Sequence, residues 1–147
     1  DNLDFRPKKD SELIDAGAMI GGKNIQFLGN APDIGAYEYG DTNYWIPGFQ
    51  DKKASVAIPK NKTTTAKKNA DLMWLKAYKS VVSDVYFGTN ILDVEKATKE
   101  SSEYKVTQQN NIYTPVGLES GKTYFWRIDS KVNGSTVMGD VFEFTVK

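Results

Sequence analysis

Short segments of alternating apolar and polar residues, separated by turn formers, fill the C-terminal two thirds of the chain. The clearest is Thr123–Val132, where Tyr124, Trp126 and Ile128 share one face of a strand because side chains alternate with a period of two. Asn133-Gly134 follows it directly, and this dipeptide is typical of a two-residue hairpin turn. No segment has a helical period long enough for a βαβ unit, so the sequence predicts an all-β fold.

The same reading predicts a seven-stranded sandwich over residues 53–147. The expected strands are Ala54–Ile58, Ala70–Leu75, Val81–Phe87, Tyr104–Val106, Ile112–Thr114, Thr123–Val132 and Asp140–Val146. Between them, the threonine-rich stretch Lys60–Lys68 is expected to be a polar connection with room for a short edge strand. Ile91–Lys99 is expected to hold one or two helical turns. Arg127 and Asp129 fall on the face opposite Trp126, where we expect a surface ion pair with a neighbouring strand.

The chain contains no histidine and no cysteine. It therefore lacks the usual general base near neutral pH, the commonest metal ligand and any thiolate. Carboxylate pairs such as Asp15 with Asp33 remain, but in turn-rich sequence these side chains commonly accept hydrogen bonds from turn amides. The sequence lacks the D-x-D-x-D spacing of a calcium-binding loop. We expect no catalytic residue, no metal and no cofactor.

The charges divide the chain in two, although 19 basic residues balance 19 acidic ones overall. Residues 1–51 carry 4 basic and 9 acidic side chains, a net −5, and residues 52–147 carry 15 and 10, a net +5. Such a shift predicts two units that meet near residue 51. A charge of +5 spread over the second unit is too dilute to predict nucleic-acid binding. The sequence contains no run of 18 apolar residues, so it predicts no membrane-spanning segment.

Residues 1–40 are rich in glycine and hold only short apolar pieces, so they cannot close a core alone. We predict that they pack partly on the sandwich through Phe5, Ile14 and Phe27. Residues 41–52 form a connector that contains Pro47-Gly48 and three aromatic residues. Two interpretations of these aromatics stay open: they pack at a domain junction, or they form a surface on which a ligand stacks.

The segment from Leu118 to Tyr124 (LESGKTY) carries the most specific motif. An apolar residue, Gly121 and Tyr124 stand three apart at the entrance to a long strand, which matches the tyrosine corner of Ig-like sandwiches. With Trp74 and the phenylalanine-rich last strand, residues 53–147 resemble a fibronectin type III domain. The resemblance implies core or structural roles for Trp74, Leu118, Gly121, Tyr124 and Trp126.

Three segments, 84–89, 123–129 and 139–145, resemble a narrower group of such modules. That group is appended to secreted polysaccharide-degrading and cell-surface proteins of Bacteroidetes-like bacteria. Residues 11–17 (SELIDAG) and 31–40 (APDIGAYEYG) resemble the final coil and C-terminal cap of right-handed parallel β-helix proteins. The resemblance implies a bacterial parent that is secreted, periplasmic or at the cell surface. Catalytic residues of that family lie on earlier coils, so none is carried over to this chain.

Two functions are compatible with these observations. The first is a non-catalytic spacer or docking module at the C-terminus of a β-helix protein, for whose whole form the resemblance implies a polysaccharide lyase or a glycoside hydrolase. Its partners would be the parent's β-helix domain and a polysaccharide or cell-surface protein. The alternative is a weak carbohydrate-binding module that uses aromatic side chains expected to be exposed, namely Tyr44, Trp45, Phe49, Tyr78 and Tyr113.

Overall fold

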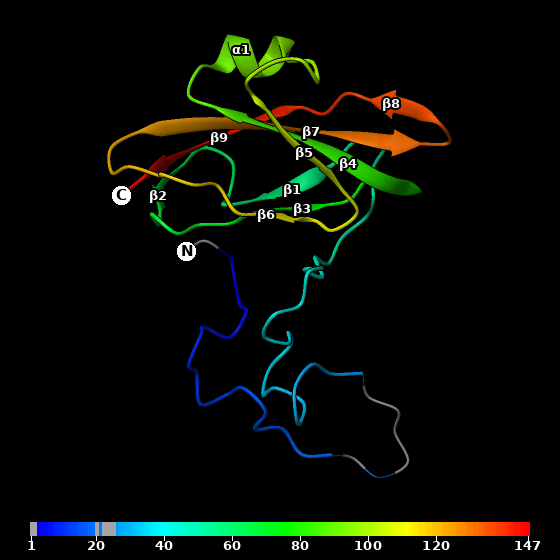
Figure 1. The fold of residues 1–147 in the computed structure, drawn as a ribbon, viewed down its shortest axis with the longest axis vertical. Helices are drawn as coiled ribbons and strands as arrows, with labels where there is room; N and C mark the ends of the chain where they lie inside the picture. The colour runs from blue at the N-terminus through cyan, green and yellow to red at the C-terminus, as the bar shows by residue number, and fades with distance from the viewer. Residues whose placement is uncertain (1–2, 20, 22–25) are drawn as a thin grey trace.

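In a computed structural model, the chain forms a two-layer β-sandwich from which an N-terminal segment projects (Figure 1). The structure describes residues 3–19, 21 and 26–147. The predicted N-terminal unit, residues 1–40, therefore lies partly outside the described residues. Every strand and the single helix of the described chain fall between Ser55 and Val146.

The described residues contain nine strands and one helix in this order: β1 (Ser55–Ile58), β2 (Thr63–Ala66), β3 (Leu72–Leu75), β4 (Ser80–Gly88), α1 (Ile91–Lys96), β5 (Tyr104–Gln108), β6 (Ile112–Tyr113), β7 (Thr123–Val132), β8 (Ser135–Val137) and β9 (Val141–Val146). The smaller sheet has the order β1-β3-β6. The larger has the order β2-β9-β7-β4-β5, with β8 paired to β7. The all-β prediction is confirmed.

The predicted count of seven strands is wrong, because β2 and β8 add two. β2 lies in the threonine-rich connection and pairs parallel with β9, a long-range partner that its own polar sequence does not indicate. β8 is the short return strand of a hairpin, with Val132 paired to Ser135. Asn133 and Gly134 between them both have positive φ, 50° and 81°, as a type I′ turn requires.

Trp74 of β3 and Trp126 of β7 meet at the centre of the sandwich with their ring centroids 6.3 Å apart. Both side chains are fully buried. Since each comes from a different sheet, their contact holds the two layers together. Buried aromatic side chains contribute about 150–250 Å² each to a small core. Apolar residues of both sheets surround this pair, including Leu72, Val85 and Phe144.

Tyr124, at the start of β7, fixes the chain where it crosses between the sheets. Its hydroxyl accepts a hydrogen bond from the backbone N–H of Glu119 (3.0 Å) and donates one to the carbonyl of Gly117 (3.4 Å). Leu118 is buried in the core beside it. The N–H of Gly121 donates to the carbonyl of Val146, which ties the same loop to the last strand (2.8 Å). This is the geometry of a tyrosine corner.

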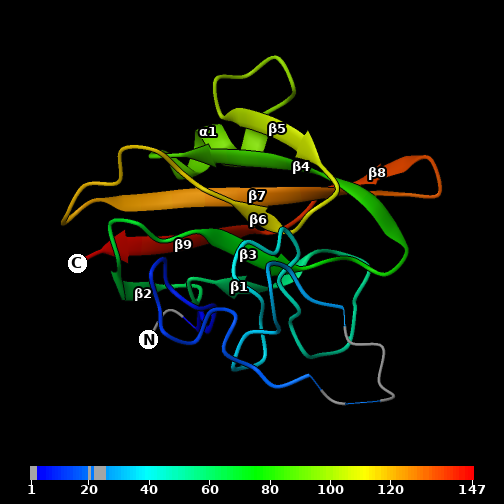
Figure 2. The same cartoon turned by 60° about the horizontal axis from the view of Figure 1, so that its bottom comes forward.

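Each sheet is also covered on its outer face. On the larger sheet lies α1 (Figure 1), whose Val94 is buried against Tyr86. Asn90 caps the helix by accepting from the N–H groups of Leu92 and Asp93. On the smaller sheet the connector inserts Tyr44 and Ile46 against buried residues of β1 and β3, which are Ile58, Met73 and Leu75. The N-terminal segment lies on this side of the sandwich (Figures 1 and 2).

We expect Tyr124→Phe to lower the free energy of unfolding by about 1–2 kcal/mol, because the substitution removes both corner hydrogen bonds and keeps the ring. Urea unfolding measures the change. Tyr78→Phe is a matched control, since the Tyr78 side chain is 58% exposed, and it should change stability by less than about 0.5 kcal/mol. Equal effects of the two variants would contradict the role given to the corner.

Candidate functional site

The most specific polar contact between the connector and the sandwich joins Tyr44 to Asn111, in the turn before β6. The Asn111 amide accepts from the Tyr44 N–H (2.8 Å) and donates to the Tyr44 carbonyl (2.7 Å) and to the Trp74 carbonyl (2.8 Å). Both residues are buried, and Tyr44 is only 4% exposed. One side chain therefore satisfies both backbone groups of a connector residue inside the protein, as buried polar groups require.

The Tyr44 side chain joins two further parts of the chain to this point. Its ring stacks on Tyr37 with centroids 4.3 Å apart. Its hydroxyl donates to the carbonyl of Leu3 (2.8 Å) and accepts from the N–H of Phe5 (3.1 Å). Burial raises the pKa of this hydroxyl above its ordinary value. Tyr44 therefore connects both ends of the N-terminal segment to the sandwich.

An ion-pair network forms a second attachment. Arg6 pairs with Asp71 beside β3 (2.5 Å) and also with Asp4 on its own segment (2.8 Å). Asp71 accepts a further hydrogen bond from Thr114 (2.6 Å). The hydrogen bond to Asp4 is the main cause that raises the pKa of the Arg6 guanidinium. Together with Tyr44, this network fixes the N-terminal segment at two points. We call these contacts of Tyr44, Asn111 and Arg6 the joint.

Within the N-terminal segment, carboxylates take the place of regular secondary structure. Asp15 accepts from the N–H groups of Asn30 (2.7 Å) and Ala31 (3.1 Å), and these bonds lower its pKa. Asp33 accepts from the N–H of Asp15 (2.8 Å), and Glu38 accepts from the N–H of Asp33 (3.1 Å). The three carboxylates thus hold the turns of this segment, as the sequence predicts for Asp15 and Asp33.

The same segment leaves much apolar surface uncovered. Seven of its large apolar side chains are at least 40% exposed: Leu3, Phe5, Leu13, Met19, Leu28, Ile34 and Tyr39. The prediction that Phe5 packs on the sandwich is wrong, because its ring is 69% exposed and only its backbone contacts Tyr44. Neither Ile14 nor Phe27 belongs to a hydrophobic cluster of the described chain. The joint is instead polar and aromatic.

The five aromatic residues expected to be exposed separate into two groups. Trp45, Phe49 and Tyr78 are exposed by 68%, 90% and 58%. Tyr113 is half-buried and packs near Phe87, with ring centroids 6.4 Å apart. Tyr44 is buried in the joint, so the expectation of an exposed ring there is wrong. Tyr44 therefore packs at the domain junction, as the first interpretation has it, whereas Trp45 and Phe49 are exposed.

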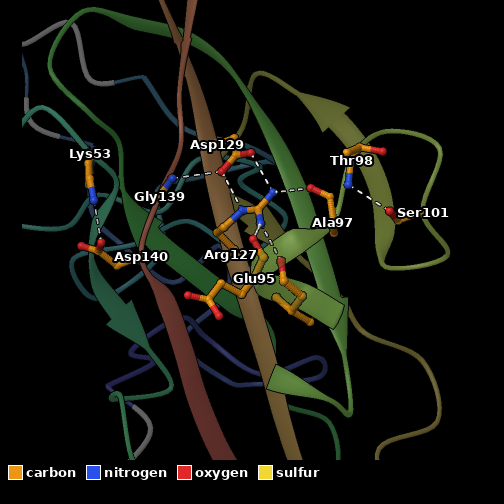
Figure 3. A network of polar contacts seen from close by, with 10 residues as sticks. Lys53, Glu95, Ala97, Thr98, Ser101, Arg127, Asp129, Gly139 and Asp140 are labelled. Carbon is orange, nitrogen blue, oxygen red and sulfur yellow. Dashed lines mark hydrogen bonds and ion pairs between the residues drawn. The ribbon is translucent and has the colours of Figure 1, made fainter. Parts of the chain in front are cut away.

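The expected surface ion pair of Arg127 and Asp129 with a neighbouring strand is wrong, because the two residues pair with each other (2.9 Å) and α1 covers them (Figure 3). Arg127 is 1% exposed and lies over the ring of Tyr86 (4.3 Å from guanidinium carbon to centroid). Two of its N–H groups bond Asp129, and the other three bond carbonyls at the end of α1, those of Val94, Glu95 and Ala97. Arginine has five donors, so none is left for a ligand.

The described part of the chain contains neither a cluster of metal ligands nor a helix of membrane-spanning length. No group of three or more Asp, Glu, His or Cys residues is placed to hold a metal ion there. No helix in the described residues is long and apolar enough to cross a membrane. The exposed features of the described chain include the apolar side chains of the N-terminal segment and the aromatic residues Trp45, Phe49 and Tyr78.

Comparison with known proteins adds little to this picture. No family model and no curated protein matches the chain. Among the solved structures, one similar chain is described as a Fn3-like protein from Clostridium thermocellum. It shares 15% identity with a TM-score of 0.46, over 67% of this chain and 96% of that one. A similarity of this size says nothing about function, so our account of the fold rests on the strand order and the tyrosine corner.

We expect Asn111→Ala to lower the free energy of unfolding by about 2–3 kcal/mol, because it leaves three buried backbone groups without their partner. It should also speed limited proteolysis within residues 41–53. Urea unfolding measures the loss of stability, and protease digestion measures the rate of cleavage. Gln109→Ala, at an exposed position of the same turn, is the matched control and should behave as wild type. Unchanged proteolysis in Asn111→Ala would contradict the function given to the joint.

Proposed function

We propose that this chain is a non-catalytic accessory module of a larger secreted bacterial protein, in which it holds a partner domain in a fixed position. The observation that carries the proposal is the exposed apolar surface of the N-terminal segment. That segment is ordered by its own carboxylates and fixed to the sandwich by the joint, yet seven large apolar side chains face outward. Apolar surface of this extent commonly marks a contact with another body.

The strand order supports a fibronectin type III type of sandwich. Without β2 and β8, seven strands remain, and they can be counted from one to seven along the chain. The first, second and fifth of them (β1, β3 and β6) form one sheet, and the third, sixth and seventh (β4, β7 and β9) lie in the other. Ig constant-type sandwiches divide these six strands in the same way. The fourth strand, β5, pairs here with β4 rather than joining the smaller sheet. This placement and the tyrosine corner of Tyr124 favour the fibronectin type III variant.

The partner that suits the N-terminal segment is the body of a parallel β-helix, of which this segment would form the final coil and cap. A terminal repeat of a solenoid must present one apolar side to its neighbour and close the stack with the other. Turns held by Asp15, Asp33 and Glu38 and apolar residues directed outward fit such a coil. The secreted bacterial setting is part of the same proposal and rests on the sequence resemblance alone.

The polar clusters of the described sandwich also support a structural role. Arg127 uses all five of its donors within the fold. Asp84, which is buried, pairs with Lys99 (2.9 Å) and accepts a hydrogen bond from Thr107. These charged groups bond to one another and to the backbone of α1, so their contacts hold the fold together.

Hydrogen exchange tests the proposal by comparing this 147-residue chain with a longer natural protein that includes the residues before Asp1. We expect peptides from residues 3–19 and 26–40 to exchange at least about tenfold more slowly in the longer protein, because a neighbouring coil covers them. Peptides from β7 and β9 are the internal control and should not change. Equal exchange of the N-terminal peptides in both proteins would contradict the proposal.

A further inference from the structure

Three exposed aromatic rings lie on backbone that the fold holds in place. The Trp45 carbonyl accepts from the Tyr37 hydroxyl (2.8 Å), next to the stacked Tyr37 and Tyr44 rings. The Tyr78 N–H donates to the carbonyl of Asp51 (2.8 Å), which ties the turn before β4 to the end of the connector. The rings are therefore exposed but not on a free linker, and a ligand would meet them already positioned.

Phe49 depends on the glycine before it. Gly48 has a φ of 149°, and a Cβ there would stand 3.2 Å from the Leu75 side chain. The connector thus passes close over β3 at a place where glycine is the residue that fits. Phe49 is directed outward from this crossing and is 90% exposed.

Two adjoining hollows run along this surface and share Gly48 and Gln50. One, of about 540 Å³, is lined by Trp45 and by the amide of Asn43. The other, of about 630 Å³, is lined by Phe49 and Tyr78. These volumes lie within the range of small-molecule sites. Because the two hollows share Gly48 and Gln50, they form one continuous groove, which we call the track. Trp45 lies in the first hollow, and Phe49 and Tyr78 lie in the second.

The polar residues of the track distinguish it from an ordinary apolar docking surface. Asn43 and Gln50 carry amides, which can both donate and accept hydrogen bonds, as a ligand with many hydroxyl groups requires. The Asn43 oxygen already accepts from Lys76 Nζ (3.3 Å), which leaves its amide N–H groups for a ligand. Each half also has one acidic and one basic residue, Asp41 with Lys76 and Asp51 with Lys52. The charges that line the two hollows cancel, and a further cation beside the track, Lys79, lies over the Tyr78 ring (5.3 Å from Nζ to centroid). This balance of the lining fits a neutral ligand better than an anionic one.

We propose that the track of Trp45, Phe49 and Tyr78 binds a neutral polysaccharide chain. A pyranose ring has apolar C–H faces that stack on aromatic rings and hydroxyl groups at its edge that bond to amides. The two joined hollows suit an extended chain of sugars. Tyr44 and Tyr113 take no part, since one is buried and the other packs near Phe87. This inference does not depend on the proposed docking of the N-terminal segment.

Native electrophoresis of the full chain in gels that contain soluble neutral polysaccharides tests the proposal, with xylan, mixed-linkage β-glucan, galactomannan and soluble starch as probes. We expect at least one of them to retard the chain. Phe49→Ala and Tyr78→Ala should each weaken binding about tenfold, the loss expected for one aromatic stacking contact. Tryptophan emission gives a second readout: Trp74 and Trp126 are fully buried, so a shift on binding reports Trp45.

Phe5→Ala is the matched control, because Phe5 is an exposed aromatic of the N-terminal segment outside both hollows. This variant should bind as wild type. Three outcomes would overturn the proposal. They are no retardation by any of the four polymers, retardation that survives the Phe49→Ala, Tyr78→Ala double variant, and retardation that is lost at high salt.

Discussion

The buried amide of Asn111 is the contact on which the arrangement of this chain depends. It pairs with both backbone groups of Tyr44 and with the carbonyl of Trp74, so it joins the connector to the smaller sheet in one orientation. A connector without such a partner would leave its backbone groups in water and would turn freely. With this contact, the stack of Tyr37 on Tyr44 and the ion pair of Arg6 have fixed positions from which to hold the N-terminal segment.

A consequence is that the two outward-facing surfaces have different chemical character. The N-terminal segment presents aliphatic and aromatic side chains over turns held by carboxylates, which suits the side of a protein domain. The connector presents three aromatic rings among amides and balanced charges, which suits a hydroxyl-rich ligand. Because the joint fixes both, a partner domain and a ligand would be held at a constant distance from each other.

The parts of the fold that sequence predicts are those determined by local pattern. The period of two locates β4, β7 and β9, and the spacing of Leu118, Gly121 and Tyr124 predicts the tyrosine corner. Asn111 was not predicted, because its partner Tyr44 lies 67 positions away and nothing local marks it. Arg127 was placed on the correct face but wrongly at the surface, since alternation shows which way a side chain points and not that α1 covers it.

The central claim is that the joint holds the N-terminal segment rigidly on the sandwich. The distance between these two parts of the chain tests it most directly. The chain has no cysteine, so Glu12→Cys with Val116→Cys, both at exposed positions, places one spin label on the N-terminal segment and one on the sandwich. Double electron–electron resonance then gives the distribution of distances. The account predicts a single narrow distribution. A broad distribution, of the kind a flexible linker produces, would contradict it.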